Sequence, residues 1–177
     1  RGQHGESQDS HGNNSHQVPE RGIHTLAVRH MKPNYRFSMT VEPFEFIASG
    51  ANRRGLLFVC DHASRMLPAQ YAGLGLSPAA FSTHIACDIG AAEVTRALAV
   101  HFEAPAVLAR WSRLLIDLNR GEDDPTLVMK LSDGSIIPGN RSADESEVAS
   151  RVSQFHAPYH HRVAEEIGAL RRAGAIP

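Results

Sequence analysis

Short runs of apolar residues alternate with helical patterns in this chain from residue 55 onwards. Residues 55–60 (GLLFVC), 106–109 (AVLA) and 114–118 (LLIDL) are apolar runs of the length typical of buried strands, often parallel ones covered on both faces. Between the first two runs, Ile89, Val94, Leu98 and Phe102 recur at helical spacing. This spacing predicts a helix over residues 91–102 with that stripe facing the core. The alternation of strands and helices predicts an α/β protein.

Turn and helix signals define the remaining elements. Ser77 followed by Pro78 predicts a short helix with the serine as its N-cap. Residues 121–140 are rich in Asp, Gly and Pro, with Asp133-Gly134 as the clearest turn, and we expect them to form a mobile border of the active site. A helical pattern runs from residue 143 onwards. Within it Pro158 either lies in the first turn of a second helix or kinks a single one.

The two ends of the chain differ from this pattern. Residues 1–38 are rich in His, Gln, Asn, Ser and Gly without periodicity, which predicts a disordered, non-native leader before a domain over residues 39–177. The leader's histidines lack ligand-like spacing, so we expect them to take no part in the chemistry. After Gly174 the chain turns apolar again, as a new strand would begin, and we expect the domain to be truncated at its C-terminus.

Composition narrows the function classes. The chain has 177 residues, of which 42% are hydrophobic and 21% charged, with a formal net charge of -1, and this predicts one core in one domain. It has no basic stripe for a nucleic-acid backbone and no apolar run long enough for a membrane span. We expect a cytoplasmic protein, with Cys60 and Cys87 reduced and buried.

The first candidate site is the segment SRLLIDLNR at residues 112–120. Arg113 and Arg120 bracket it, and Asp117 and Asn119 alternate with an apolar residue so that both can point to one side. Guanidinium groups bind carboxylates through paired hydrogen bonds, which suits an acidic ligand. The alternative is a structural ion pair between Asp117 and one arginine.

Three further groups of residues are candidates for a functional site. Asp61 and His62 follow the first apolar run and suit a metal ion, the alternative being a capping Asp and a solvent-facing His. His84 and Asp88 are four residues apart and would share a helical face if the helix began early; otherwise Asp88 is an N-cap. A surface helix without function accounts equally well for the last polar group, which comprises Arg151, His156, Tyr159, His160 and His161.

Taken in order, four segments resemble the N-formylglutamate amidohydrolase family from about Phe44 to the end of the chain. They are DHASR with Pro68, HIACDIGA at residues 84–91, SRLLIDLNR at residues 112–120, and PYH at residues 158–160. The resemblance implies a three-layer fold, with a mixed sheet flanked by helices, related to zinc carboxypeptidases. It also implies hydrolysis of the formyl amide of N-formylglutamate, or of a related N-acyl amino acid, and a role in histidine degradation.

The resemblance also implies residue roles. His62 corresponds to a zinc ligand, with Asp61 or Asp88 as a further ligand, and Asp88 or His84 as catalytic group. Asn119 and Arg120 correspond to the pair that holds the substrate's α-carboxylate, Arg113 would take a second carboxylate, and Asp117 would orient the arginines. Arg151 and His160 are further substrate-binding candidates.

Two departures from the family pattern favour a second hypothesis. Arg65 stands where the carboxypeptidase relatives carry a glutamate, and a further metal ligand is expected beyond Pro177. Zinc held by fewer than three protein ligands is poorly supported. The alternative to a zinc-dependent hydrolase is therefore a non-catalytic binder of acidic amino acids or peptides. Neither hypothesis fixes the oligomeric state.

Overall fold

The structure, a computed structural model, describes residues 41–48 and 55–175. The predictions for the leader and for the last two residues lie outside this part. Every element described below belongs to one compact unit, Met39–Pro177. The main elements are β1 (Phe44–Ile47), β2 (Phe58–Cys60), α1 (Ala91–Phe102), β3 (Ala106–Ala109), β4 (Leu131–Ser132), β5 (Ser135–Ile136), α2 (Glu145–Arg151), the π-helix η4 (Val152–His156) and α3 (Ala157–Arg172). Three short 3-10 helices, η1 (Ala69–Gly75), η2 (Pro78–Ser82) and η3 (Pro138–Asn140), complete the set.

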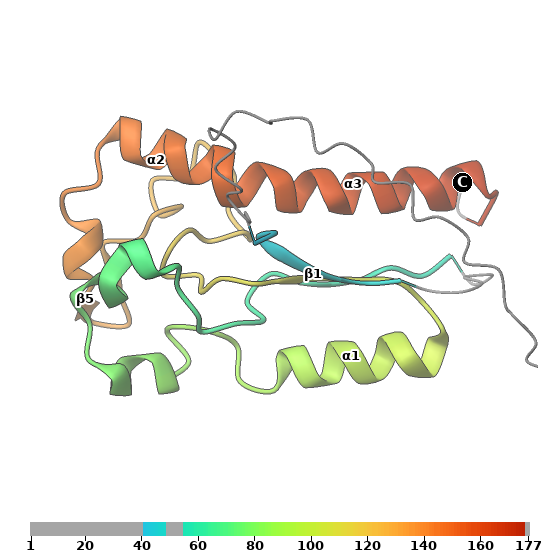
Figure 1. Ribbon diagram of the computed structural model, residues 1–177, viewed down its shortest axis with the longest axis horizontal. Coiled ribbons are helices and arrows are strands. Elements are labelled where there is room, and N and C mark those ends of the chain that lie inside the picture. Colours follow the sequence, from blue (N-terminus) through green and yellow to red (C-terminus); the bar gives the residue numbers. More distant parts are fainter. Residues whose placement is uncertain (1–40, 49–54, 176–177) are drawn as a thin grey trace, which may run out of the picture. The chain divides into compact units, whose positions relative to one another are not determined.

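A small mixed sheet forms the centre of the fold. Its order is β1-β3-β2, with β3 antiparallel to β1 and parallel to β2. All four residues of β3 are buried, since small and branched apolar side chains fill both faces of this central strand. α1 and α3 cover opposite faces of the sheet (Figure 1). The predicted α/β class and the parallel pairing of the first two apolar runs are confirmed.

The helix over residues 91–102 is confirmed, but its predicted core face is wrong in part, since Leu98 and Phe102 are half-buried, with Phe102 against Phe58 of β2, whereas the other two residues are not buried. Ile89 and Val94 are 71% and 58% exposed. The buried residues of α1 are Ala92, Thr95 and Ala99, which contribute a small-residue face toward β2 and β3. Small side chains let the helix backbone approach the sheet closely, and this packing overrides the apolar spacing that the sequence displays.

Residues 114–118 were predicted to be a strand, and this prediction is wrong. They form turns and irregular backbone instead, although Leu114, Leu115 and Ile116 are almost fully buried. The Ser112 hydroxyl accepts the N–H of Leu114, and the Asp117 carboxylate accepts the N–H of Asn119. These side chains therefore take backbone donors that a strand would offer to its neighbour. A buried apolar run cannot by itself distinguish a strand from such a segment.

Residues 121–140 are more ordered than a loop. β4 and β5 pair as a hairpin whose turn is Asp133-Gly134, both with positive φ, so the predicted turn is confirmed. Leu127, Val128 and Ile137 are buried in the core. The segment is therefore packed, and the carbonyl of Leu127 accepts the N–H of Asp117, a residue of the candidate site described below.

The C-terminal helical region is divided by a π-helix. α2 ends at Arg151, η4 follows, and α3 begins at Ala157 with Pro158 in its first turn, the first of the two predicted arrangements. The short helix after Ser77 is η2, with Pro78 in its first turn and no hydrogen bond from the Ser77 side chain to it. Cys60 and Cys87 are free and buried, as predicted.

Among the described residues, no helix is long and apolar enough to cross a membrane.

Candidate active site

Asp117 is the centre of a polar cluster inside the fold. Its side chain is 0% exposed, and it accepts hydrogen bonds from three donors. His62 Nε2 lies 2.6 Å from Oδ1, Arg113 Nη2 lies 3.0 Å from Oδ2, and the Asn119 N–H lies 3.0 Å from Oδ1. A buried carboxylate needs such partners to remain ionised. Asp117 therefore ties the loop after β2 to the segment at residues 112–120.

His62 lies between two carboxylates. Its Nδ1 is 3.3 Å from Asp88 Oδ2, on the opposite side of the ring from Asp117. Carboxylates only accept hydrogen bonds, so Nε2 carries a proton that it donates to Asp117. Nδ1 has a partner in either of two states of the ring. In the first, the ring is a protonated imidazolium, and Nδ1 donates a hydrogen bond to Asp88. In the second, the ring is neutral, and the Nδ1 lone pair binds a cation beside the Asp88 carboxylate, which is 55% exposed.

The pKa of His62 is raised and that of Asp117 is lowered, and both shifts favour the charged forms of the pair. Burial acts to lower the pKa of His62, but the hydrogen bond with Asp117 and its charge outweigh burial and raise that pKa above its usual value. For Asp117, burial acts to raise the pKa, while the hydrogen bond and charge of His62 hold it below its usual range. In the absence of a cation the site therefore favours an imidazolium beside a carboxylate.

Hydrogen bonds to the backbone hold the loops that carry these side chains together. The Asp88 N–H donates to the carbonyl of His62 over 3.0 Å, which brings the loop before α1 beside the end of β2. Ser112 is fully buried and reinforces this arrangement. Its N–H donates to the carbonyl of Met66, and its hydroxyl donates to the carbonyl of Ala86. Three loops that are distant in sequence therefore meet at Asp117.

The two predicted arginines differ in availability. Arg113 directs its two terminal nitrogens at Asp88 and Asp117, over 3.5 Å and 3.0 Å. Arg120 is 47% exposed, and its ion pairs with Asp117 and Asp124 are longer, at 3.9 Å and 3.6 Å. Arg120 and the exposed Asn119 are thus better placed than Arg113 to meet a ligand from solvent.

α3 and the last residue of η4 contact the segments around the cluster. Tyr159 donates its hydroxyl proton to Asp61 over 2.6 Å, and Asp61 is thereby held toward the helix. Burial, followed by the neighbouring Asp61 carboxylate, raises the pKa of Tyr159, so the phenol keeps its proton. His156 and His160 direct Nε2 at the carbonyls of Arg120 and Leu118. His161 instead is exposed and pairs with Glu165.

His84 does not join the cluster. Its side chain is 69% exposed and pairs with Asp133 in the β4–β5 turn. The predicted helical face shared with Asp88 is wrong, because α1 begins only at Ala91 and residues 84–86 form a turn. Asp88 is not the N-cap either, since Gly90, with φ of 82°, occupies that position.

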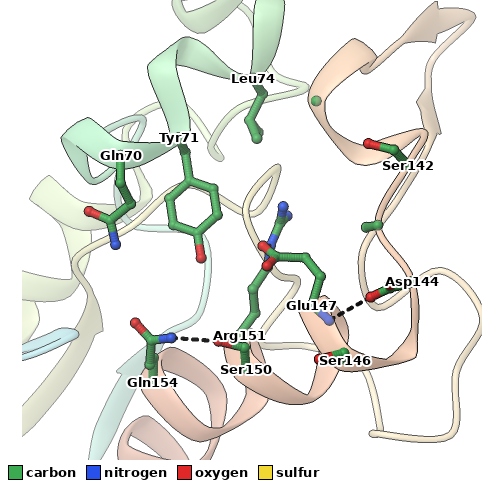
Figure 2. A pocket seen from close by; sticks show the side chains of 12 residues that line it. Gln70, Tyr71, Leu74, Ser142, Asp144, Ser146, Glu147, Ser150, Arg151 and Gln154 are labelled. Atoms are coloured by element: carbon green, nitrogen blue, oxygen red, sulfur yellow. Dashed lines mark hydrogen bonds and ion pairs between the residues drawn. The ribbon is translucent and has the colours of Figure 1, made fainter.

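Arg151 lies against a different cavity, of about 770 Å³, with its side chain close to those of Tyr71 and Glu147 (Figure 2). It is only 2% exposed. Its Nε donates to Glu147, and one terminal nitrogen donates to the carbonyl of Leu115 and to Asn140. The guanidinium therefore supports the segment that leads to Asp117, rather than facing the cluster around His62.

The metal expected from the sequence fits these residues only in part. His62 offers Nδ1 while Asp117 holds the opposite N–H, the arrangement typical of a metal-ligating histidine, and Asp88 lies on the open side. The Asp61 carboxylate is bonded to Tyr159. Within residues 41–48 and 55–175, however, no group of three or more His, Cys, Asp or Glu side chains is placed to hold a metal ion. His62 and Asp88 thus supply two donors, one fewer than a stable zinc centre requires.

Sequence reasoning missed the role of Asn140. This buried residue donates to the carbonyls of Leu114 and Met129 and accepts from Arg151. An Asn in a segment rich in Gly and Pro resembles an ordinary turn residue, so no sequence signal marks it. The Tyr159–Asp61 bond was also missed, because it joins residues 98 positions apart.

Comparisons with known proteins place this geometry in a family. A family model described as N-formylglutamate amidohydrolase matches residues 54–176. The solved structure of a gene product from Agrobacterium tumefaciens is similar over 75% of this chain and 52% of its own, with 37% identity and a TM-score of 0.70. An N-formylglutamate amidohydrolase from Ralstonia eutropha is similar in fold over 77% of this chain and 55% of its own, with 24% identity and a TM-score of 0.56. The comparison with curated proteins found no match.

The chain spans about half the length of these two solved structures. The family match covers well over half of the chain, and it includes the three loops that meet at Asp117. The chain belongs to the N-formylglutamate amidohydrolase family.

Proposed function

We propose that the chain contributes the substrate-recognition and metal-orienting part of an amidohydrolase site that acts on N-formylglutamate or a related N-acyl amino acid. The observation that carries this proposal is the Asp117 cluster, in which one buried carboxylate orients both a histidine and an arginine. We further propose that the fold is related to that of zinc carboxypeptidases, as the sequence resemblance implies.

Recognition of an acidic substrate rests on the exposed side chains of residues 119 and 120. The half-exposed guanidinium of Arg120 has only long contacts with Asp117 and Asp124, so an incoming carboxylate can replace them with a shorter, paired contact. Arg113 is engaged with two carboxylates, and its role is to complete the charge balance around Asp88 and Asp117.

His62 and Asp88 would hold a zinc ion, together with a ligand from outside the described residues. Such an ion polarises an amide carbonyl and lowers the pKa of water. Asp117 keeps the proton on His62 Nε2 and thereby aims Nδ1 toward Asp88. Asp88, if it is not itself a ligand, is the carboxylate beside His62 that can accept a proton from water.

The second candidate, a non-catalytic binder of acidic amino acids, is favoured by one observation. Within the described ranges, the half-exposed Arg120, our candidate for carboxylate binding, is present, but a three-residue metal group is not. Two measurements separate the candidates: zinc content after purification in zinc-containing buffer, and formate release from N-formylglutamate. Zinc near one ion per chain with formate release supports the hydrolase. Glutamate binding with neither zinc nor formate supports the binder.

The recognition step has its own test in Arg120→Lys, which keeps the charge but loses the planar fork. We expect the KM for N-formylglutamate, or the Kd for glutamate in a binder, to rise about tenfold with kcat little changed, because a charge-assisted contact is lost. Arg172→Lys, in the last turn of α3, is the matched control. Equal values for the two variants would remove Arg120 from the site.

A further inference from the structure

We propose that His156 and His160 are positioning residues that hold the turn at residues 117–120 through its backbone, so that Asn119 and Arg120 meet the substrate in one fixed geometry. This inference rests on the proposed function. His156 Nε2 lies 2.9 Å from the carbonyl oxygen of Arg120, and His160 Nε2 lies 2.9 Å from that of Leu118. Both contacts come from the end of η4 and the first turn of α3.

The contacts determine which ring nitrogen carries the proton. A carbonyl only accepts hydrogen bonds, so Nε2 of each ring is the donor and each neutral ring is protonated there. His156 Nδ1 is buried without a hydrogen-bond partner, and the Glu122 carboxylate lies 4.0 Å from it. For His160, burial and then the neighbouring His156 lower the pKa, which favours the neutral ring. Both histidines therefore act as hydrogen-bond donors to the turn.

The turn is held from two sides. Its Asn119 N–H donates to Asp117 from within the cluster, while the carbonyls of Leu118 and Arg120 accept from α3 and η4. The exposed side chains of Asn119 and Arg120 thus project from a backbone fixed at three points. The two imidazole rings also contact each other, with centroids 4.3 Å apart, so each limits the motion of the other. A ligand that needs a fixed guanidinium gains affinity from such preorganisation.

The test compares His160→Leu and His156→Leu with His160→Gln and His156→Gln. Leu fills a similar volume without a donor, whereas the Gln amide can return an N–H near the position of Nε2. His161→Leu, on the next residue of α3, whose side chain pairs with Glu165 instead of the turn, is the control. The His160 variants are the primary test, because His156 is buried and its replacement carries a greater risk of a folding defect. Circular dichroism and thermal unfolding establish that each variant is folded.

Two readouts separate this inference from the proposed function. The first, amide hydrogen exchange at residues 119–121, needs no ligand. We expect about tenfold faster exchange in His160→Leu, with recovery in His160→Gln and no change in His161→Leu, because a lost hydrogen bond frees the turn. The second is the KM for N-formylglutamate, or the Kd for glutamate, which we expect to rise about tenfold in His160→Leu with kcat changed less.

The outcomes are distinct. If folded His160→Leu and His156→Leu variants show control-like exchange at residues 119–121, the histidines do not hold the turn and the inference is overturned. Faster exchange with unchanged KM or Kd also overturns it, because the turn then does not position the binding groups. Faster exchange in a protein that neither binds nor hydrolyses acidic ligands would instead contradict the proposed function.

Discussion

Asp117 holds the residues of the candidate site together. Its position in the motif suggested an ion pair with one arginine, and the structure adds His62, the N–H of Asn119 and complete burial. A buried charge with several partners is costly to disrupt, because the remaining partners lose their counter-charge. Asp117 therefore contributes to stability as well as to the chemistry of His62.

Asp117→Asn is expected to lower the free energy of unfolding by about 3 kcal/mol, since the amide leaves His62 and Arg113 without their buried counter-charge. Asp88→Asn is the matched control. Asp88 is half-exposed and contacts the same two partners, so its replacement should cost less than about 1 kcal/mol. Urea unfolding followed by circular dichroism measures both. Comparable losses in the two variants would show that Asp117 is not the centre of the cluster.

At the scale of elements, α1 shows how packing overrides apolar spacing. Its buried face of Ala92, Thr95 and Ala99 lets it approach β2 and β3 closely, while Val100 points to solvent. The loop before the helix carries Asp88, whose N–H is bonded to the carbonyl of His62 after β2. The sheet and the site are thus connected through the helix.

Ala99→Leu is expected to destabilise the fold by about 1–3 kcal/mol, because the added methylene groups have no space against the sheet. Val100→Leu, on the exposed face of the same helix, should change stability by less than about 0.5 kcal/mol. Chemical denaturation of the two variants compares them directly. The assignment of the helix face would be wrong if the Val100 variant were the less stable one.

An ion pair joins β1 to α1. Arg96 donates to both carboxylate oxygens of Glu45, over 3.1 Å and 2.7 Å, and this hydrogen bonding holds the pKa of Glu45 below its usual value. A depressed carboxyl pKa stabilises the fold above the unfolded-state pKa of about 4.5, and this contribution is lost as the pH falls through the folded-state value. Because both side chains are about two-fifths exposed, the contribution is at most about 1 kcal/mol.

Glu45→Gln should therefore lower the free energy of unfolding at pH 7, and the difference from the unmodified chain should shrink as the pH falls from about 4.5 toward 3. Glu42→Gln, at an exposed glutamate just before β1, controls for the change of net charge. Unfolding measured across this pH range checks the sign. A difference that grows toward low pH would contradict the pairing.

At the scale of the whole molecule, the sequence predicted the elements whose signal is local. The helix at residues 91–102, the strand at residues 106–109 and the Asp133-Gly134 turn carry their own periodicity or turn residues. Residues 114–118 were mistaken for a strand because their structure depends on distant partners such as Asn140 and Arg151. The fold class followed from the alternation of elements, and the family followed from four motifs in order.

The candidate site was predictable in its residue types but not in its geometry. His62 and Asp117 were selected from their positions at or after apolar runs and Asp88 from its spacing to His84, and the three do meet. His84, selected from that same spacing, and Arg151, selected from the polar group on the last helical segment, lie elsewhere, because helix phase and burial decide where a side chain points. Helix phase and burial arise from packing across the whole unit.

The most direct test of the site assignment is formate release from N-formylglutamate, with zinc supplied, by the unmodified chain and by its His62→Gln and His84→Gln variants, each within a protein that also supplies the third zinc ligand. We expect release by the unmodified chain and by His84→Gln, and release at background level from folded His62→Gln, because His62, unlike His84, lies between Asp88 and the buried Asp117. Release by His62→Gln at the rate of the unmodified chain, or loss of release in His84→Gln instead, would contradict the account.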